Sequence, residues 1–534
     1  MDQPRQRSRW ELAVDLSGHE GPLFLRIART IVDEVRRGRL RPGDELPGSR
    51  VLATTLGVHR NTVLAALREL SAEGWITTEG TRGTFISSAL PEVSAKGFAP
   101  TSARREEMPV RVGYALPLAG RVASEASLPV PPRRGMLSLN GGIPDVRLVP
   151  TAPLARAYRR ALQASGRAWL TYGDPRGCEH LRAGLAEMLS QTRGVAATAE
   201  SIVVTRGSQM AIDLVARTLL SPGDVVLVEA LGYRPAWDAL QAAGARLVPV
   251  PLDADGVSVD AVRAVIAEGG ARAIYLTPHH QYPTTAVLAA GRRLELLELA
   301  RRTKIIVIED DYDHEFHYDG RPVLPLASAD RSGVVLYIGT LSKVLAPGLR
   351  VGYLVAPVPV IDRVVRTRAF VDRQGDHIVE RAVAELLEDG EVQRHIRRAR
   401  RAYRARRDVL VSELRLRLGG ALAFGVPLGG TALWARVAGD IDLSAWVAEA
   451  GARGVTMQQG QRFAFDGRAR PFVRLGFAQL DESELREAVR RLEGALVRSA
   501  ARLYPRGEKS RAPVKPEGAP PRNPPRSVRV RPGP

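Results

Sequence analysis

The sequence predicts a large α/β body built on a mostly parallel sheet, preceded by a small helical unit with a β-hairpin. Six short apolar runs between positions 201 and 338 alternate with segments of amphipathic helical periodicity, which is the pattern of a doubly wound sheet. Nearer the N-terminus, two helical segments flank a glycine turn and precede two short β-prone runs. A chain of 534 residues exceeds one ordinary domain, so we expect at least two.

The N-terminal unit is expected over 21–88, after a charged tail at 1–20. Apolar residues at helical spacing predict a first helix from about 23 to 35, which Gly38 ends. A short second helix is expected over 49–56, with Ser49 as its N-cap. A third helix begins at Arg60 after the turn at 57–59. The runs 75–78 and 84–86, separated by a polar turn, then predict a hairpin.

The start of the third helix carries side chains that suit DNA. The first residues of a recognition helix contact base edges in the major groove, and Arg60, Asn61 and Thr62 offer the donors and acceptors for this. Arg50 is placed for a phosphate, and Arg82, at the hairpin tip, for the minor groove or the backbone. The alternative is a protein-interaction domain with incidental arginines, which the charge of residues 1–88, 13 basic against 11 acidic, slightly favours.

The remaining composition describes the segments around these domains. Residues 89–135 contain seven prolines without sustained periodicity and predict a linker. Net charge is +19, and residues 501–534 hold nine basic and two acidic side chains with nine prolines. This predicts a disordered basic tail over 500–534 that either holds DNA weakly or has no role. One cysteine, no signal-peptide pattern and no apolar run of membrane-spanning length indicate a cytoplasmic protein with no membrane partner.

In the body, chemically useful side chains follow the expected strands at 201–205, 225–229, 246–250, 273–276, 305–309 and 334–338. Parallel strands present ligand groups at their carboxyl ends. Ser208 and Gln209 open a helix there and form a candidate anion site, and Tyr233 could stack on a flat ligand. Asp310 could hold a pyridine nitrogen protonated, and Tyr312 points the same way two residues later.

A metal site is the rival interpretation of the acidic strand end. Its ligands would be Glu309, Asp310, Asp311 and His314, but no second ligand cluster accompanies them, so no metal is expected.

The segment GTLSKVLAPGLRVGY, residues 339–353, completes the set. A lysine that attacks an aldehyde must be deprotonated, which burial beside cationic groups favours, and Lys343 is the candidate. Thr340, Ser342 and Arg350 surround it with donors for a phosphate.

These segments together resemble the fold-type I aminotransferases, which depend on pyridoxal 5'-phosphate (PLP), over residues 136–499. The resemblance implies a small C-terminal α+β subdomain and assigns Lys343 as the catalytic lysine that bonds to the cofactor. It assigns the pyridine nitrogen to Asp310, the phenolic oxygen to Tyr312 and ring stacking to Tyr233. The phosphate would be held by Ser208, Gln209, Thr340, Ser342 and Arg350.

The same resemblance has consequences beyond one chain. Tyr172, in WLTYGDPRG, matches the tyrosine that reaches the phosphate of a neighbouring subunit, which implies a homodimer. Arg474 matches the arginine that binds a substrate carboxylate.

One segment departs from the usual aminotransferase pattern. Where many of these enzymes have Asn-Pro-Thr-Gly, this chain has PHHQYPTT over 278–285. Tyr282 therefore replaces the asparagine, which weighs against efficient transamination. The resemblance implies that His280 and Gln281, just before it, take part in binding the cofactor. This loop and the string EDDYDHEFHYDG, 309–320, are similar to the MocR/GabR regulators. Residues 38–87 resemble the GntR-family winged helix-turn-helix that those regulators carry.

The resemblance implies a transcriptional regulator that binds a double-stranded DNA operator and senses PLP or an amino compound, in vitamin B6 or amino-acid metabolism. The linker is long enough for each DNA-binding unit to sit over its own body or its partner's. Two alternatives stay open. One is a working aminotransferase with an accessory DNA-binding domain, and the other is a DNA-binding protein whose body only dimerises. Residual transamination is compatible with the regulator.

Overall fold

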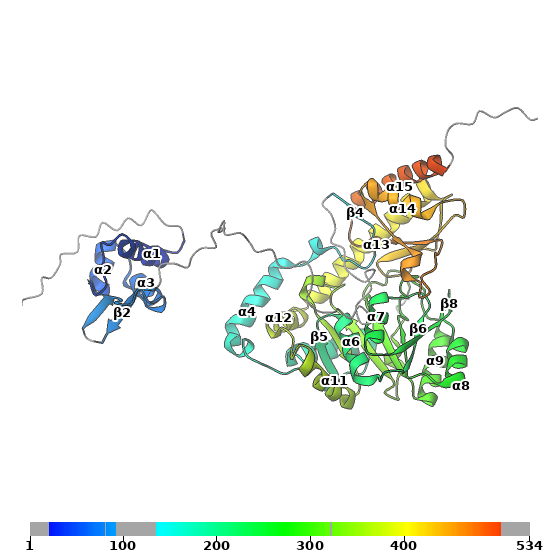
Figure 1. Cartoon of the computed structure of the whole chain (residues 1–534), viewed down its shortest axis with the longest axis horizontal. Coiled ribbons are helices and arrows are strands. Elements are labelled where there is room, and N and C mark those ends of the chain that lie inside the picture. The colour runs from blue at the N-terminus through cyan, green and yellow to red at the C-terminus, as the bar shows by residue number, and fades with distance from the viewer. Residues whose placement is uncertain (1–20, 81, 92–134, 321–322, 504–534) are drawn as a thin grey trace, which may run out of the picture. The chain divides into compact units, whose positions relative to one another are not determined.

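The computed structural model describes residues 21–80, 82–91, 135–320 and 323–503. The chain divides into two compact units, Met1–Leu116 and Pro117–Pro534, and each is described by itself (Figure 1). The predicted tail 1–20 and most of the predicted linker 89–135 lie outside the described residues. Helix α15 runs through Leu503, four residues into the predicted tail, and the rest of that tail lies outside them. None of the described helices is long and apolar enough to cross a membrane.

The first unit is a helix-turn-helix with a small sheet, as predicted. Its elements are α1 (Leu23–Arg36), β1 (Glu45–Leu46), α2 (Ser49–Leu56), α3 (Arg60–Ala72), β2 (Ile76–Glu79) and β3 (Gly83–Ile86). The strands pair antiparallel in the order β1-β3-β2, so the hairpin gains a third strand that the sequence did not predict. Ile31, Leu70, Trp75 and Ile86 are buried together and join the helices to the hairpin.

The boundary of α2 corrects one prediction. Gly48 occupies the N-cap position and α2 begins at Ser49, so Ser49 is not the cap. Its hydroxyl instead accepts a hydrogen bond from Nε of Arg60 at 3.2 Å, which ties the start of α2 to the start of α3. Gly57, at φ 61°, ends α2 in the left-handed conformation that glycine adopts without strain.

The second unit is built on a seven-stranded sheet in the order β5-β13-β12-β11-β10-β6-β7. The strands are β5 (Ile202–Thr205), β6 (Val225–Glu229), β7 (Arg246–Val250), β10 (Ala273–Leu276), β11 (Ile306–Asp311), β12 (Val335–Thr340) and β13 (Gly352–Val355). All six predicted strands are present. Only β13 pairs antiparallel with its neighbours, and it begins at the end of the lysine segment, where no strand was predicted.

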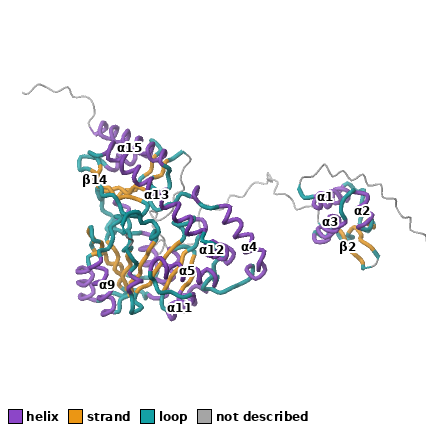
Figure 2. The backbone as a smooth tube through the Cα atoms, turned by 180° about the vertical axis from the view of Figure 1, so that it is seen from behind, coloured by secondary structure: helices purple, strands orange, loops and turns teal. Residues whose placement is uncertain are grey.

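Alternation along the strands divides the sheet into two covered faces. Val226 and Val228 belong to the core beneath α6 (Ser208–Leu219), α7 (Arg234–Ala242) and α11 (Val358–Val371), whereas Leu227 belongs to the core on the other face. That face is covered by α5 (Glu179–Arg193), α8 (Val259–Gly269), α9 (Ala290–Thr303) and α12 (His377–Glu388). In both views α12 lies toward the β5 side of the sheet and α9 toward the opposite side (Figures 1 and 2).

A smaller C-terminal subdomain, orange to red in Figure 1, completes this unit. Its four-stranded sheet has the order β14-β15-β18-β17 and packs with the second half of α13 and with α14 and α15 around a buried core that includes Trp446. Its elements are α13 (Glu391–Leu418), β14 (Leu422–Ala423), β15 (Ala432–Val437), α14 (Leu443–Ala452), β17 (Gln458–Gln459), β18 (Phe472–Gly476) and α15 (Glu482–Leu503). The other elements are β4 (Leu137–Ser138), α4 (Thr151–Trp169), β8 (Leu252–Asp253), β9 (Gly256–Val257), α10 (Leu326–Ala329) and β16 (Val455–Thr456).

Candidate functional site

The carboxyl ends of β11 and β12 bring the predicted carboxylate and lysine together. Asp310 lies at the end of β11, and Lys343 follows β12 on the neighbouring strand. Each affects the ionisation of the other, so the two charges lie within electrostatic reach. The site is therefore where parallel-sheet geometry predicts it.

Asp310 carries a buried oxygen that the fold does not use. Tyr275 donates a 2.8 Å hydrogen bond to Oδ2, whereas Oδ1 has no hydrogen-bond partner among the described residues. Burial, with a contribution from the neighbouring carboxylate of Asp311, raises the pKa of Asp310 to about 7. A buried carboxylate oxygen without a partner requires a cationic or hydrogen-bonding ligand to offset its desolvation.

The amine of Lys343 is held by the backbone at Gly142. Its Nζ donates a 2.5 Å hydrogen bond to the carbonyl oxygen of Gly142. Burial, reinforced by the positive charge of Arg474, lowers the pKa of Lys343 to about 8. A larger share of this amine is therefore neutral near pH 7 than for an exposed lysine, and the neutral amine is the nucleophilic form.

The N-terminus of α6 and Arg350 form a cradle for an anion. Gly207, at φ 80°, precedes Ser208, and a Cβ built on Gly207 would lie 3.0 Å from Nη2 of Arg350. The same Nη2 donates a 2.6 Å hydrogen bond to the carbonyl of Arg206. Helix N-terminal N–H groups beside a guanidinium are suited to a phosphate.

The hydroxyls and the amide around this cradle are not equally available. The hydroxyl of Ser342 is buried without a partner among the described residues, and so is Oε1 of Gln209, whose Nε2 donates to Pro235 at 2.7 Å. The hydroxyl of Thr340 is engaged locally, since it donates to Val351 and accepts from the N–H of Ser342. The Thr340 hydroxyl therefore stabilises the turn, and its hydrogen is not free to bind a phosphate.

Arg474 lies on β18 with much of its guanidinium unused. It is 1% exposed, and neither Nε nor Nη1 has a hydrogen-bond partner in the described part of the chain. Its Cζ lies 4.6 Å from the centroid of the Tyr282 ring. A Cβ on Gly141 would fall 1.9 Å from Nη1, so only glycine leaves room for this arginine. A buried, partly unpaired guanidinium is suited to a carboxylate ligand.

The loop after β10 supports the site mainly through its backbone. Tyr312 donates a 2.9 Å hydrogen bond to the carbonyl of His280. The amide of Gln281 is fully engaged, because it donates to Leu231 and Tyr282 and accepts from Thr284. Gln281 therefore fixes the loop rather than presenting a free group. The ring of Tyr233 packs edge-on against Tyr282, with their centroids 5.5 Å apart.

The predicted DNA-contacting side chains lie at the starts of α2 and α3 and in the turn between β2 and β3. Arg50, Arg60 and Asn61 are exposed around the starts of α2 and α3, and Thr62 is half-buried. The inner side of α3 is buried through Val63, Ala66 and Leu70. Arg82, in the β2–β3 turn, is exposed and lies 3.6 Å from a carboxylate oxygen of Glu79. The polar start of α3 is thus open to a ligand.

Comparisons with known proteins place both units. Residues 135–492 match the family described as "Aminotransferase class I and II", and residues 23–86 match "Bacterial regulatory proteins, gntR family". The chain is 31% identical over 483 residues to the "Probable rhizopine catabolism regulatory protein MocR" of Rhizobium meliloti, covering 89% of this chain and 94% of that protein. The chain belongs to the MocR family of transcriptional regulators.

Two further relatives bear on the MocR-family chain. The "HTH-type pyridoxine biosynthesis transcriptional regulator PdxR" of Corynebacterium glutamicum is 32% identical over 406 residues, covering 76% of this chain and 82% of that protein. Among solved structures, the α-aminoadipate aminotransferase LysN from Thermus thermophilus has a TM-score of 0.65 and 30% identity, covering 69% of this chain and 94% of LysN. LysN was solved with N-(5'-phosphopyridoxyl)-L-leucine.

Two residues of the MocR-family chain that the sequence singled out, Tyr172 and Glu309, have contacts of their own. Tyr172 is 74% exposed, and the guanidinium of Arg373 stacks over its ring at 4.3 Å. Glu309 accepts hydrogen bonds from the N–H groups of Leu326 and Ala327 at the start of α10, and it is therefore structural. The alternative metal site of Glu309, Asp310, Asp311 and His314 is therefore not supported, because Glu309 already binds the start of α10.

Asp311 is also structural in the MocR-family chain. It accepts a 2.7 Å hydrogen bond from Tyr337 and lies 3.0 Å from the ring of His314. Although burial acts in the opposite direction, His314 and Arg193 hold the pKa of Asp311 well below its usual range.

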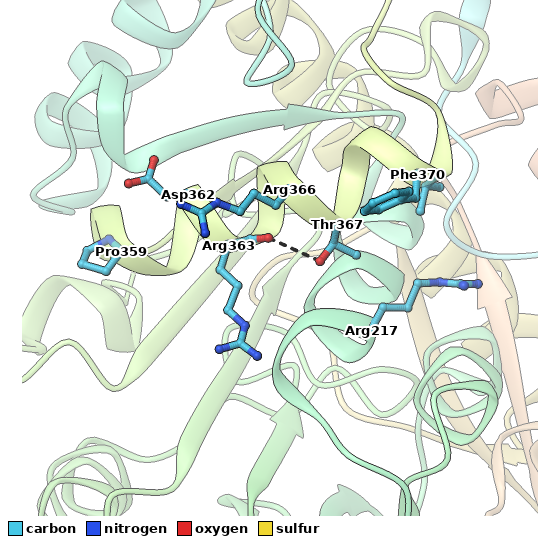
Figure 3. A pocket seen from close by; sticks show the side chains of 8 residues that line it. Arg217, Pro359, Asp362, Arg363, Arg366, Thr367 and Phe370 are labelled. Carbon is cyan, nitrogen blue, oxygen red and sulfur yellow. Dashed lines mark hydrogen bonds between the residues drawn. The ribbon is translucent and has the colours of Figure 1, made fainter.

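A surface hollow of the body does not coincide with this cluster. It lies along α11, with Arg217 contributed from α6 (Figure 3). The residues that line it are Arg217, Pro359, Asp362, Arg363, Arg366, Thr367, Phe370 and Val371. None of them is a predicted site residue.

Three contacts of the MocR-family site were not predicted from sequence. They are the hydrogen bond of Tyr275 to Asp310, the Gly142 carbonyl on Lys343, and the Tyr282 ring under Arg474. The adjacent glycines Gly141 and Gly142 were the available signal for a close backbone approach.

Proposed function

We propose that this MocR-family regulator binds PLP at Lys343 and that occupancy of the site by PLP or by an amino acid changes its binding to a DNA operator. The observation that carries the proposal is the buried, unpartnered Oδ1 of Asp310, within electrostatic reach of Lys343. The residues fit PLP in charge and kind, since they supply an amine, a carboxylate and an anion cradle. When bound, PLP supplies an aldehyde and an electron-withdrawing ring.

Each side chain has a physical task in this proposal. Asp310 would hold the pyridine nitrogen protonated, because a buried anion favours a nearby cation. Arg350, Ser342 and the first N–H groups of α6, next to Ser208 and Gln209, would hold the phosphate. Lys343 would supply the neutral amine. Tyr233 would pack on the ring, and Tyr312 would approach the phenolic oxygen while it stays bonded to the loop.

Arg474 supports an effector with a carboxylate. Its buried, unpaired nitrogens carry a cost that an anion would offset, and PLP held by Arg350 leaves Arg474 free. An α-amino acid could then place its amine near Lys343 and its carboxylate at Arg474, whose charge already acts on Lys343. The alternative effector is PLP itself, because the relative PdxR is a transcriptional regulator of pyridoxine biosynthesis.

The working assembly that we propose is a homodimer in the cytoplasm. Tyr172 is 74% exposed, which suits a residue that serves the neighbouring subunit. Phe370, 93% exposed on α11, precedes Arg373 by three residues, and Arg373 stacks on Tyr172. We propose that these side chains take part in the contact between the subunits.

The test is binding of the purified full chain to DNA flanking its own gene, with and without PLP, at two salt concentrations. Two salts are needed because non-specific binding to phosphates weakens steeply as salt rises. Sequence-specific binding whose affinity changes with PLP supports the proposal. Specific binding that responds only to amino acids keeps the regulator but excludes free PLP as the signal. Absence of specific binding at both salts would contradict the proposal.

A second function, a working aminotransferase with a DNA-binding domain, is favoured by the intact Lys343, Asp310 and Arg350 set. Steady-state transfer of amino groups from an amino acid to a keto acid would establish it. The loop around Tyr282, where many aminotransferases carry asparagine, weighs against fast turnover.

A further inference from the structure

Four of the chain's nine histidines gather beside the site just described. His279 and His280 follow β10, and His314 and His317 follow β11, its parallel neighbour in the sheet. Ring centroids lie 4.2 Å apart for His279 and His280, 4.4 Å for His279 and His314, and 6.3 Å for His280 and His317. The proposed regulator function gives no role to the rings of His279, His280 and His317.

Three of the rings have nitrogen atoms that the described fold does not use. Both ring nitrogens of His279 and of His317, and Nε2 of His280, are shielded from solvent and make no hydrogen bond to any described residue. One nitrogen from each of the three lies within 4.8 Å of the others. Buried polar atoms without partners are uncommon, and a group of three that converge indicates a ligand.

One of these rings is already oriented as a metal ligand would be. Nδ1 of His280 lies 2.8 Å from Oδ1 of Asp313, which leaves Nε2 as the ligand atom. A carboxylate on the far nitrogen of a histidine is the usual orienting partner in metal sites.

We propose that His279, His280 and His317 bind a divalent transition-metal ion of the Zn²⁺ class, with a fourth position left for water. Three imidazole ligands suit Zn²⁺, Ni²⁺ or Cu²⁺ and do not suit Mg²⁺ or Ca²⁺, which prefer oxygen. In a tetrahedral zinc site with Zn–N bonds of about 2.0 Å, the nitrogens stand roughly 3.3 Å apart. The nitrogens, which lie within 4.8 Å of one another, would have to approach by up to about 1.5 Å to bind the ion.

The site joins two parts of the body. Gly429, between β14 and β15 of the C-terminal subdomain, pairs with His317 in an isolated antiparallel bridge. A Cβ on Gly429 would lie 2.3 Å from Nε2 of His280, so this segment packs directly on the ligand atom. A bound ion would hold the loops after β10 and β11 together, next to the segment around Gly429 of the subdomain. The ligand atoms differ from those proposed for PLP, so the two sites can be tested separately.

The experiment uses the full chain without a histidine tag, stripped of metal by a chelator. Calorimetric titration with Zn²⁺ and visible absorbance with Co²⁺ are expected to show one ion per chain. His279→Ala and His317→Ala should each abolish this stoichiometric binding. His180→Ala, which removes an exposed histidine outside the cluster, should retain it. Asp313→Asn should weaken affinity by roughly 10- to 100-fold, since it removes only the orienting carboxylate.

Folding is checked independently by far-ultraviolet circular dichroism and by DNA binding of each variant. His279→Gln, which keeps the volume of the side chain more closely, replaces His279→Ala if the alanine variant does not fold. Absence of a stoichiometric ion in the wild-type chain would overturn the proposal. Binding that persists in folded variants at both His279 and His317, or that His180→Ala reduces as much as they do, would also overturn it.

Discussion

At the scale of single residues, the site holds charges that the fold alone does not satisfy. Asp310 has a pKa raised to about 7, chiefly by burial. As pH rises from about 4 to 7, the unfolded chain releases a proton that the folded chain keeps, so ionising Asp310 lowers the stability of the folded chain across this window. A cationic ligand beside Asp310 would reverse that loss. The buried carboxylate therefore lowers the free energy of unfolding but favours binding of a cationic ligand, as is common at functional sites.

Replacing Asp310 by asparagine tests whether its charge contributes to PLP affinity. Asp310→Asn keeps the shape and removes the charge, so PLP affinity should fall roughly 10- to 150-fold, the range for a lost hydrogen bond to a charged group. Tyr275→Phe, which removes only the 2.8 Å hydrogen bond to the carboxylate, should cost roughly 2- to 10-fold. Equilibrium titration monitored by the visible absorbance of bound PLP measures both. Wild-type affinity in Asp310→Asn would show that the carboxylate does not contact the ring.

The lowered pKa of Lys343 predicts a pH profile. Since burial and Arg474 lower this pKa from 10.5 to about 8, attachment of PLP to the apo chain should speed up as pH rises and level off above about 8. Stopped-flow absorbance follows the reaction, and a simple primary amine measured in parallel corrects for the ionisation of PLP. Arg474→Ala should move the inflection to higher pH, whereas Arg468→Ala, an exposed arginine of the same subdomain, should not. An inflection near 10.5 in the wild-type chain would contradict the lowered pKa.

At the scale of elements, most of the architecture followed from periodicity. The six parallel strands and the helix-turn-helix were predictable because each carries an uninterrupted apolar or amphipathic pattern. The four-residue β13 was not, because its antiparallel position depends on pairing with β12 and β5 rather than on its own sequence. Helix α15 continues past the predicted boundary at 499, since the helix-breaking prolines begin only at Pro505.

The residues of the site also differ in whether the sequence could predict them. Asp310, Tyr312 and Lys343 could be predicted because they lie at the end of a strand or shortly after one in the chain. Tyr275 could not, because its contact depends on the register that sets it opposite Ile308, one strand away and on the same face as Asp310. The histidine cluster likewise joins two loops that are adjacent only through the sheet. Register and side-chain direction across strands are not encoded in any local pattern.

Helix α3 makes a prediction about DNA recognition. Arg60→Ala should reduce specific affinity by roughly 5- to 150-fold and relax the sequence preference, because a bidentate base contact contributes about 1–3 kcal/mol of discrimination. Ser49→Ala is the matched control, since it removes the 3.2 Å hydrogen bond to Arg60 but keeps the guanidinium. Arg82→Ala should weaken binding to all sequences and reduce the salt slope by about one. Fluorescence anisotropy on specific and scrambled duplexes, at several salts, measures these effects. Equal losses on both duplexes for Arg60→Ala would assign Arg60 to phosphate instead.

At the scale of the whole molecule, the question is how a ligand in one unit changes binding by the other. A ligand shifts an equilibrium only by its differential affinity for the two states, and the effect is reciprocal. The body contains two chemically different groups that could bind such a ligand, the amine of Lys343 and the guanidinium of Arg474. PLP needs the first, whereas an amino acid is expected to need both. Substitutions at the two positions should therefore separate sensing of the cofactor from sensing of an effector.

Lys343→Ala and Arg474→Ala should give different patterns of DNA response. In the wild-type chain, the ligand should change operator affinity by a factor in the usual allosteric range, roughly 5- to 150-fold. Lys343→Ala should abolish the response to both PLP and amino acids, because covalent attachment is lost, while affinity for DNA without ligand stays unchanged. Arg474→Ala should keep the response to PLP and lose the response to amino acids, and Arg468→Ala should keep both. Operator titrations of the four proteins, each with no ligand, with PLP, and with PLP plus a panel of amino acids, make the comparison. Since Lys343 and Arg474 lie in a different unit from α3, any loss of response without loss of basal affinity must arise from coupling between the units. A full wild-type response in Lys343→Ala would show that the signal does not pass through the lysine.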